Sequence, residues 1–214
     1  MKTENEARDR IVEIGRSLHN RGLSPGSSGN ISCRVPGGWL LTPTNSSLGR
    51  LEASSLSKLD WDGNLVGGDK PSKESPLHLA LYRNRPGAGA IIHLHSTYSA
   101  AVSCLEGLDP CSCIPPLTPY FVMRVGKVPL IPYRRPGDAA LAQDIGRAAP
   151  KHAAVLLANH GPVVSGADLD GALNAIEELE ETAKLLLLLS GQRSRELTRG
   201  QIDELKAHFG AQWD

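Results

Sequence analysis

The stretch "GAIIHLHSTYSA", residues 89–100, places two of the chain's seven histidines in an apolar run that is typical of a buried strand. Successive side chains of a strand point to opposite faces, so His93 and His95 would project from the same side, about 6 to 7 Å apart. Two imidazoles at that separation can bind one cation. The stretch therefore predicts a buried strand that carries two candidate metal ligands.

Helices and strands are mixed along the chain on both sides of this stretch. Strands are expected at 31–35, 38–43, 89–95, 127–133, 153–161 and 161–166, and helices at 4–21, 75–85, 99–107, 137–149, 167–190 and 198–210. Glu74 would lie just outside the helix that has Ser75 as its N-cap and Pro76 in its first turn. Some strands are joined by tight turns and not by crossover helices, which favours antiparallel pairing. The pattern predicts a layered α/β/α sandwich with a mixed, largely antiparallel central sheet.

The length and net charge of the chain favour a single-domain protein that binds a small molecule. The 214 residues predict a single domain, 1–214, that buries a substantial core without disulfides or a structural metal. Lysine plus arginine number 23, as do aspartate plus glutamate, so no net charge attracts the chain to nucleic acid or an acidic membrane. A small-molecule ligand is expected instead. The N-terminus "MKTENEARDR" is charged and has no apolar segment, which argues against a signal peptide and predicts a soluble, cytoplasmic protein.

Two other features of composition lead to structural expectations. The longest apolar run, "LLLLL" at 185–189, is too short to span a bilayer; its leucines are expected in the core, with a subunit contact as the alternative. The cysteines lack C-x-x-C spacing and are expected to be free thiols, with a zinc or redox role for the last two as the minor alternative; they are Cys33, Cys104, Cys111 and Cys113.

A catalytic zinc site needs a third protein ligand beside His93 and His95. His160 ends the apolar run "AAVLLANHG" at the edge of a strand, where a side chain can point into a cleft. His78 is an alternative third ligand, although it falls within an expected helix. The candidate metal set is His93, His95 and His160, and two ordinary strand histidines are the simpler alternative.

Three turns rich in glycine, serine or lysine have the composition of an anion site. They are "GSSGNIS" at 26–32, "TPTNSS" at 42–47 and "GDKPSKE" at 68–74, the last of which precedes a helix N-terminus. Backbone N–H groups, hydroxyls and a helix dipole can together bind a phosphate. Glu74 ends the third turn, and a carboxylate so close to a phosphate would be repelled unless it points to the metal, where it could act as an acid or base.

In this order and at these separations, the motifs resemble the class II aldolase/adducin family. The segments that carry the resemblance are "SSGNIS", "LLTPTN", "KPSKE", "HLHSTYSAAVS" and "LLANHG", and it covers nearly the whole chain. Within the family, "GSSGNIS", "TPTNSSLGRL", "GDKPSKE" and "VMRVGKVPLIPYRRPGD" are most similar to the 3-oxo-tetronate 4-phosphate decarboxylases. The fuculose 1-phosphate aldolases are a more distant likeness.

The resemblance implies roles for individual residues. His93, His95 and His160 take the positions of the family's metal-binding histidines, with Zn2+ as the usual ion, and Glu74 takes the place of the catalytic carboxylate. Phosphate-binding groups would lie at Ser27, Asn30, Thr44, Asn45 and Ser72.

Two positions depart from the aldolase pattern, and a third has an open role. Lys73 stands where the aldolases usually carry a second serine, and "TPTN" at 42–45 stands where they often end in glycine, so the aldolase substrate is not simply carried over. Lys73 is expected to pair with the phosphate or to orient the Glu74 carboxylate, and a solvated turn lysine is the simpler alternative. Tyr120 lies near the aldolases' proton-donating tyrosine and is expected to line the substrate pocket.

The resemblance implies a zinc-dependent carbon-carbon lyase that acts in four-carbon sugar-acid catabolism. It would decarboxylate a 3-oxo-tetronate 4-phosphate, of the 3-dehydro-4-phosphoerythronate type, to dihydroxyacetone phosphate and CO2 through an enediolate that Glu74 protonates. A homotetramer with active sites near subunit contacts is implied as well. The alternatives are a fuculose 1-phosphate aldolase-like enzyme and a non-catalytic adducin-type interaction domain, which would lack the three histidines and Glu74 that this chain retains.

Overall fold

A mixed sheet of eight strands organises the computed structural model, which describes residues 3–213. The strands lie in the order β4-β3-β2-β1-β5-β8-β7-β6, and neighbours are antiparallel except for the parallel pair β6 and β7. Their bounds are β1 Asn30–Val35, β2 Gly38–Leu41, β3 Ser57–Leu59, β4 Leu65–Gly67, β5 Ala90–His93, β6 Leu130–Ile131, β7 Ala154–Leu157 and β8 Gly161–Gly166.

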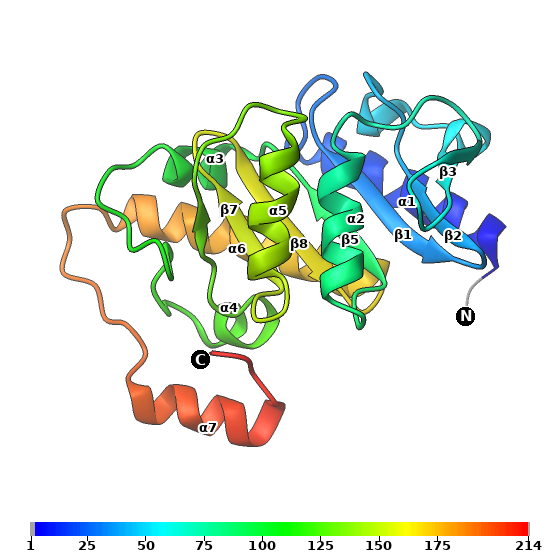
Figure 1. Cartoon of the computed structure of the whole chain (residues 1–214). Coiled ribbons are helices and arrows are strands. Elements are labelled where there is room, and N and C mark those ends of the chain that lie inside the picture. Colours follow the sequence, from blue (N-terminus) through cyan, green and yellow to red (C-terminus); the bar gives the residue numbers. More distant parts are fainter. Residues whose placement is uncertain (1–2, 214) are drawn as a thin grey trace.

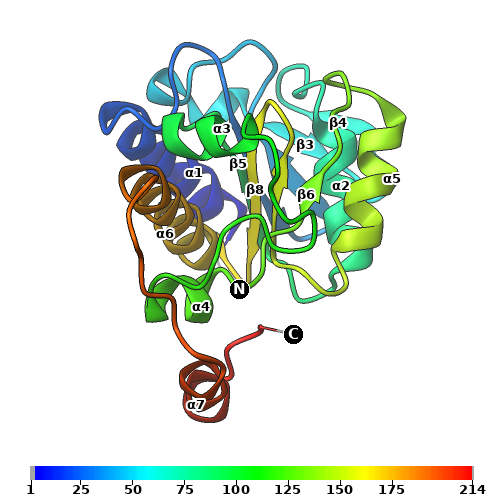
Figure 2. The ribbon, with the colours of Figure 1, turned by 90° about the vertical axis from the view of Figure 1, so that its left-hand side faces the viewer.

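Helices cover both faces of this sheet (Figure 1). Their bounds are α1 Glu4–Asn20, α2 Ser75–Asn84, α3 Thr97–Ser103, α4 Pro119–Arg124, α5 Ala139–Ala148, α6 Leu169–Leu188 and α7 Arg199–Phe209. Figure 2 shows α1 and α6 on one side of the sheet and α2 and α5 on the other. The predicted α/β/α sandwich with a mixed, largely antiparallel sheet is confirmed.

The sheet separates two hydrophobic clusters. The cluster beneath α1 and α6 includes Ile92, and the cluster beneath α2 and α5 includes Ile91. These two residues are consecutive in β5, and they contact opposite layers because side chains alternate along a strand. A central strand covered on both faces must be apolar throughout, which explains the run that precedes His93.

Local sequence signals set the helix ends. The Thr3 side chain accepts a hydrogen bond from the Glu6 N–H, and the Glu6 carboxylate accepts one from the Thr3 N–H, so α1 begins with a capping box. The N-cap of α2 is Glu74 and not Ser75 as expected, and the Glu74 side chain makes no capping hydrogen bond. Its carboxylate is therefore free to point elsewhere.

Several expected elements are shorter than the sequence indicated. β5 ends at His93, so His95 lies two residues beyond the strand. The strand expected at 127–133 is reduced to Leu130–Ile131, because the prolines at 129 and 132 have no N–H to donate. The helix expected at 99–107 begins at Thr97 and ends at Ser103.

Other elements carry no clear signal in the sequence. β3 and β4 have three residues each, and α4 has six. Such lengths cover at most two turns of helix or one full alternation of a strand, so their periodicity could not be recognised.

The leucine run at the end of α6 was expected in the core, and that expectation is wrong. Leu185, Leu188 and Leu189 are 39%, 66% and 37% exposed, whereas Leu186 and Leu187 are partly buried against the core. Within residues 3–213, no helix is both long and apolar enough to cross a membrane. The four cysteines are free, as predicted.

Gly161 provides a test of how closely β8 packs against the end of β5. A Cβ at this position would lie 2.3 Å from the carbonyl oxygen of Leu94. We expect Gly161→Ala to lower the free energy of unfolding by about 1–3 kcal/mol through overpacking, as measured by urea denaturation. Gly87→Ala is the control, because a Cβ there meets nothing within 4 Å. Equal stability of Gly161→Ala and the wild type would contradict the close packing.

Candidate metal centre and active site

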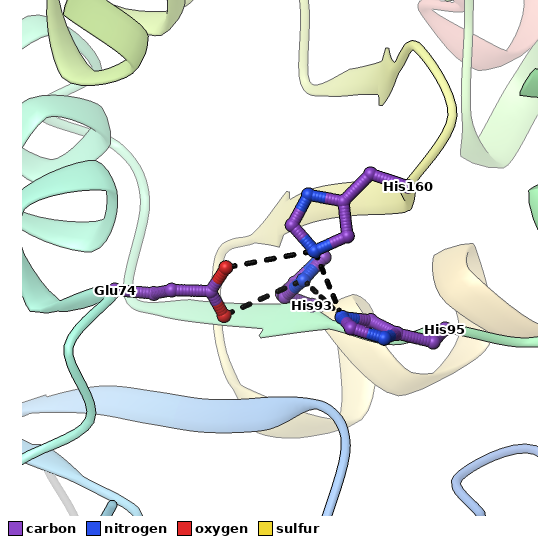
Figure 3. A group of neighbouring side chains, drawn as sticks. All are labelled: Glu74, His93, His95 and His160. Carbon is purple, nitrogen blue, oxygen red and sulfur yellow. Dashed lines mark hydrogen bonds and ion pairs between the residues drawn. The ribbon is translucent and has the colours of Figure 1, made fainter. Parts of the chain in front are cut away.

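Figure 3 shows the carboxylate of Glu74 and the imidazoles of His93, His95 and His160 pointing toward one another. His95 Nε2 lies 3.1 Å from His93 Nε2 and 2.9 Å from His160 Nε2. On the other side of the cluster, Glu74 Oε2 is 3.6 Å from His93 Nε2, and Glu74 Oε1 is 3.6 Å from His160 Nε2. Each of the four side chains thus offers one atom within 4.8 Å of the others.

The backbone of β8 sets the orientation of His93. This histidine is fully buried at the end of β5, and its Nδ1 lies 2.8 Å from the carbonyl oxygen of Pro162. A carbonyl only accepts, so Nδ1–H donates and the neutral ring keeps Nε2 unprotonated. The Nε2 lone pair of His93 therefore faces the cluster.

A short turn between β7 and β8 positions His160. Asn159 has a left-handed φ of 54°, which turns the chain immediately before the histidine. The N–H of Asn159 donates to the Ser103 carbonyl at 3.0 Å, and the N–H of His160 donates to the Ser103 hydroxyl at 3.1 Å. The C-terminal end of α3 thereby holds this turn in place.

The other end of α3 follows directly after His95. Ser96 is the N-cap of α3, and its hydroxyl donates to the carboxylate of Glu180 in α6 at 2.7 Å. The same buried carboxylate accepts from the N–H groups of Tyr98 and Ser99, at 2.8 and 2.9 Å. Glu180 thus satisfies the free N–H groups at the start of α3. Because α3 is anchored to α6, it supports His95 at one end and the His160 turn at the other.

One oxygen of the Glu74 carboxylate accepts a hydrogen bond, and the other has no hydrogen-bond partner among residues 3–213. Oε2 accepts a hydrogen bond from Asn30 Nδ2 at 2.7 Å. Oε1 is the buried side-chain atom in residues 3–213 that has no hydrogen-bond partner. Burial raises the pKa of Glu74, but the electrostatic influence of His93, the Asn30 hydrogen bond and the influence of His160 outweigh it, and the net pKa is lowered.

Burial keeps the three histidines neutral. It is the main cause of the lowered pKa of His93 and of His95, and it lowers the pKa of His160 to about 4. A neutral imidazole with a free lone pair is the form that binds metals.

These side chains fit a divalent metal ion. Tetrahedral ligands about 2.0–2.1 Å from zinc stand about 3.3 Å from one another, close to the separations between the Nε2 atoms here. Three imidazole lone pairs at such distances repel unless a cation or a proton lies between them. The free Oε1 of Glu74 adds a buried negative charge on the remaining side. The chain therefore contains a group that could hold a divalent metal.

Three of the four cluster residues, Glu74, His95 and His160, line a cavity of about 400 Å3, whereas His93 is fully buried. All three predicted anion turns reach the same cavity. The second and third turns lie side by side through the bridge between Pro43 and Pro71. Gly29, with a φ of 79°, lets the first turn approach, because a Cβ there would lie 2.9 Å from the carbonyl oxygen of His93. The predicted residues that line the cavity are Ser27, Asn30, Thr44, Asn45, Ser72, Lys73, Glu74, His95 and His160.

Two other candidate residues, His78 and Tyr120, lie outside the cluster and the cavity lining. His78, the alternative metal ligand, is not in the cluster, since its ring nitrogens bond to Asn30 and Ser32. Tyr120 does not line the cavity: it is 56% exposed on α4, with Arg124 over its ring. Figure 1 and Figure 2 both place α4 at the opposite end of the sheet from α3.

Sequence reasoning missed two aspects of the cavity. Pro136, in the loop before α5, forms part of its wall, and nothing in the sequence relates this loop to the three turns. The Asn30 amide is already bonded to Glu74, so Asn30 does more than border an anion site. In the sequence, the position of Asn30 within the Gly/Ser turn at 26–32 indicated only a possible role in binding an anion.

Comparison with known proteins shows where the chain belongs. A family model described as the Class II Aldolase and Adducin N-terminal domain matches residues 9–187. The chain belongs to the class II aldolase and adducin family. Membership confirms the resemblance that was based on the five segments.

Three relatives illustrate the degree of similarity. The 3-oxo-tetronate 4-phosphate decarboxylase of Pectobacterium atrosepticum is 53% identical, over 96% of this chain and 94% of its own. The L-fuculose phosphate aldolase of Methanocaldococcus jannaschii is 37% identical, over 83% of this chain and 94% of its own. The crystal structure of YgbL from Klebsiella pneumoniae superposes with a TM-score of 0.94 at 51% identity, and covers 96% of this chain and 100% of its own.

Buried His78 should make the metal-free protein sensitive to acid. Burial lowers the pKa of His78 from 6.5 to about 3, so below pH 6.5 the unfolded chain binds a proton that the folded chain does not. Stability present above pH 6.5 is therefore lost as the pH falls toward 3. We expect His78 to account for a loss of about 2 kcal/mol in the free energy of unfolding between pH 7 and pH 5.

Urea denaturation at the two pH values measures this loss. The matched variant is His78→Gln, which keeps an amide donor and acceptor but does not titrate, and its loss should be smaller. The same loss in His78→Gln and the wild type would contradict the assignment.

Proposed function

We propose that this protein is a 3-oxo-tetronate 4-phosphate decarboxylase, which converts a phosphorylated four-carbon 3-oxo acid of the 3-dehydro-4-phosphoerythronate type to dihydroxyacetone phosphate and CO2. The observation that carries the proposal is the composition of one cavity. Its lining combines Glu74, His95 and His160 of the cluster with three turns of hydroxyl, amide and lysine groups. The relatives that bear the decarboxylase name are also more similar than the aldolases.

The three turns would bind the phosphate. Ser27, Thr44, Asn45 and Ser72 offer hydroxyl or amide donors at the cavity, and Lys73 offers a cation. Ser72 directly precedes Lys73 and Glu74, at the N-terminus of α2, where the helix dipole favours an anion. Lys73 also lies close enough to lower the pKa of His95 and His160, so its charge acts within the site.

Glu74 would deliver the proton that the reaction needs. The bond between C1 and C2 breaks, CO2 leaves, and the electron pair stays on C2 beside the C3 ketone as an enediolate. A proton transferred to C2 completes dihydroxyacetone phosphate. Glu74 is ionised in the free protein, and a bound anionic substrate would raise its proton affinity because like charges disfavour the carboxylate.

His93, His95 and His160 would hold one divalent ion, and Zn2+ suits three neutral imidazoles with an open position. When bound, the ion supplies Lewis-acid stabilisation of the negative charge that develops on the ketone oxygen. The protein's own part is to keep three Nε2 atoms unprotonated and converging, and to hold Glu74 across from them.

An aldolase similar to the fuculose phosphate enzymes is the second candidate, favoured by the 37% identity to the Methanocaldococcus jannaschii protein. The two activities share the cluster and the phosphate site, so only assay separates them. A non-catalytic adducin-type domain would not need four convergent donors.

We also propose a cytoplasmic homotetramer in which residues 1–214 form one domain. The exposed leucines at the end of α6 support a subunit contact. In such a tetramer, Tyr120 would reach a cavity only from a neighbouring subunit, because it does not line the cavity of its own chain.

Replacement of Glu74 tests the decarboxylase and its proton donor. Wild-type protein loaded with Zn2+ should release CO2 from one of the D- or L-erythronate- or threonate-derived 3-oxo acid 4-phosphates and show little condensation of dihydroxyacetone phosphate with aldehydes. Glu74→Gln should lower kcat by about 10²–10⁴-fold, the usual contribution of a positioned acid or base. CO2 release and metal content are measured together.

Glu52→Gln, at an exposed position, is the control and should retain wild-type activity. Full activity of Glu74→Gln, or of protein stripped of metal, would refute the mechanism. Efficient aldol condensation without CO2 release would favour the aldolase instead.

Lys73→Ala tests the phosphate site. Loss of a charge-assisted hydrogen bond costs about 1.5–3 kcal/mol, so KM should rise about tenfold or more while kcat changes little. The control is Lys151→Ala, an exposed lysine that does not line this cavity. An unchanged KM would identify Lys73 as a solvated turn residue.

A further inference from the structure

A continuous chain of buried hydrogen bonds leads from α2 and β1 to the catalytic carboxylate. Tyr82 Oη lies 2.9 Å from Ser32 Oγ, and Ser32 Oγ lies 2.7 Å from His78 Nδ1. His78 Nε2 lies 2.5 Å from Asn30 Oδ1, and Asn30 Nδ2 lies 2.7 Å from Glu74 Oε2. Each of the five residues is at most 6% exposed.

The Glu74 carboxylate, at one end of this series of hydrogen bonds, determines which group donates in each of them. The Glu74 carboxylate only accepts, so the Asn30 amide nitrogen must face it and the amide oxygen must face His78. That oxygen also only accepts, so His78 carries its proton on Nε2. Nδ1 of His78 then accepts from the Ser32 hydroxyl, which in turn accepts from Tyr82.

The surroundings of His78 fix both the protonation state and the orientation of its ring. Burial lowers the pKa of His78 to about 3, so the ring is neutral and carries one proton. The ring is stacked on Trp39, with centroids 6.3 Å apart and an interplanar angle of 14°. Hydrogen bonds at both nitrogens and a stacked indole leave the ring one orientation.

We infer that His78 is a positioning residue for proton transfer: through Asn30 it holds Oε2 of Glu74 and leaves Oε1 as the oxygen that protonates the substrate. This inference rests on the proposed function. Oε1 is buried, lacks a hydrogen-bond partner among residues 3–213, and lies 3.6 Å from Nε2 of His160, which is one of the residues that line the cavity. A carboxylate held by one oxygen presents the other in a fixed place, which proton transfer to carbon requires.

A fixed proton donor has a stereochemical consequence. C2 of the enediolate is planar, and Oε1 lies on one side of it only. Decarboxylation in D2O should therefore place one deuterium on one face of C2, and the hydroxymethyl group of the product should have a single configuration. If Glu74 were not held in place, solvent water would compete with Oε1 and protonate C2 from the opposite face as well, and the configuration would be mixed.

The test compares two replacements at His78 in Zn2+-loaded protein. His78→Leu removes both hydrogen bonds, and His78→Gln can restore them. We expect His78→Leu to lower kcat about tenfold or more and to mix the product configuration, with KM and zinc content near the wild-type values. His78→Gln should restore both kcat and a single configuration. The KM, zinc content and configuration separate positioning from a general loss of structure.

Ser32→Ala is the second variant, for the case that His78→Leu does not fold. It removes the donor to Nδ1, so the His78 ring loses one of the two hydrogen bonds that fix its orientation and holds the Asn30 amide less firmly. The matched control is Ser165→Ala, a buried serine of β8 whose hydroxyl donates to the Ala153 carbonyl. Ser32→Ala should mix the configuration, and Ser165→Ala should not.

Each outcome decides between proposals. If the wild type releases no CO2, the proposed function fails and this inference fails with it. If the wild type is active and folded His78→Leu and Ser32→Ala retain its kcat and a single product configuration, the inference alone is overturned.

Discussion

The backbone pairing of β5 with its two neighbours is the constraint on which the site depends. In this register His93 lies opposite Asn30 of β1 and opposite Val163 of β8. A slip by one residue would turn His93 to the other face of the sheet and separate it from Asn30. Because Asn30 bonds to Glu74, the same pairing that places a candidate metal ligand also places the hydrogen-bond partner of the Glu74 carboxylate.

The convergence of polar groups beside β5 is costly, and the surrounding structure offsets that cost. Burial disfavours the ionised carboxylate and the protonated imidazoles alike. Hydrogen bonds hold the groups where they are: Pro162 fixes His93, Ser103 fixes the turn of His160, and Glu180 fixes the helix after His95. These supports come from β8, α3 and α6, so the site is a product of the whole sandwich and not of one motif.

Particular elements show how far sequence reasoning reaches. The alternation of His93 and His95 and the position of His160 at a strand end were sufficient to select three histidines that the structure brings together, although β5 stops before His95. From the sequence, His78 could be considered only as a single histidine in a helix. Its hydrogen-bond partners on β1, Ser32 and Asn30, lie 46 and 48 positions away along the chain. β3, β4 and α4 escaped recognition because short elements are defined by their neighbours and not by their own pattern.

The sequence by itself determined the layered fold and the family, and it singled out the three histidines, Glu74 and the three turns that meet at the cavity, because each has a local pattern of burial, spacing or composition. The tertiary structure decided which oxygen of Glu74 is held and which is free, that Asn30 bonds to the carboxylate, and that Tyr120 does not line the cavity of its own chain. The physical reason is distance along the chain: hydrogen-bond direction and side-chain orientation depend on partners that only the packed sheet and helices bring together.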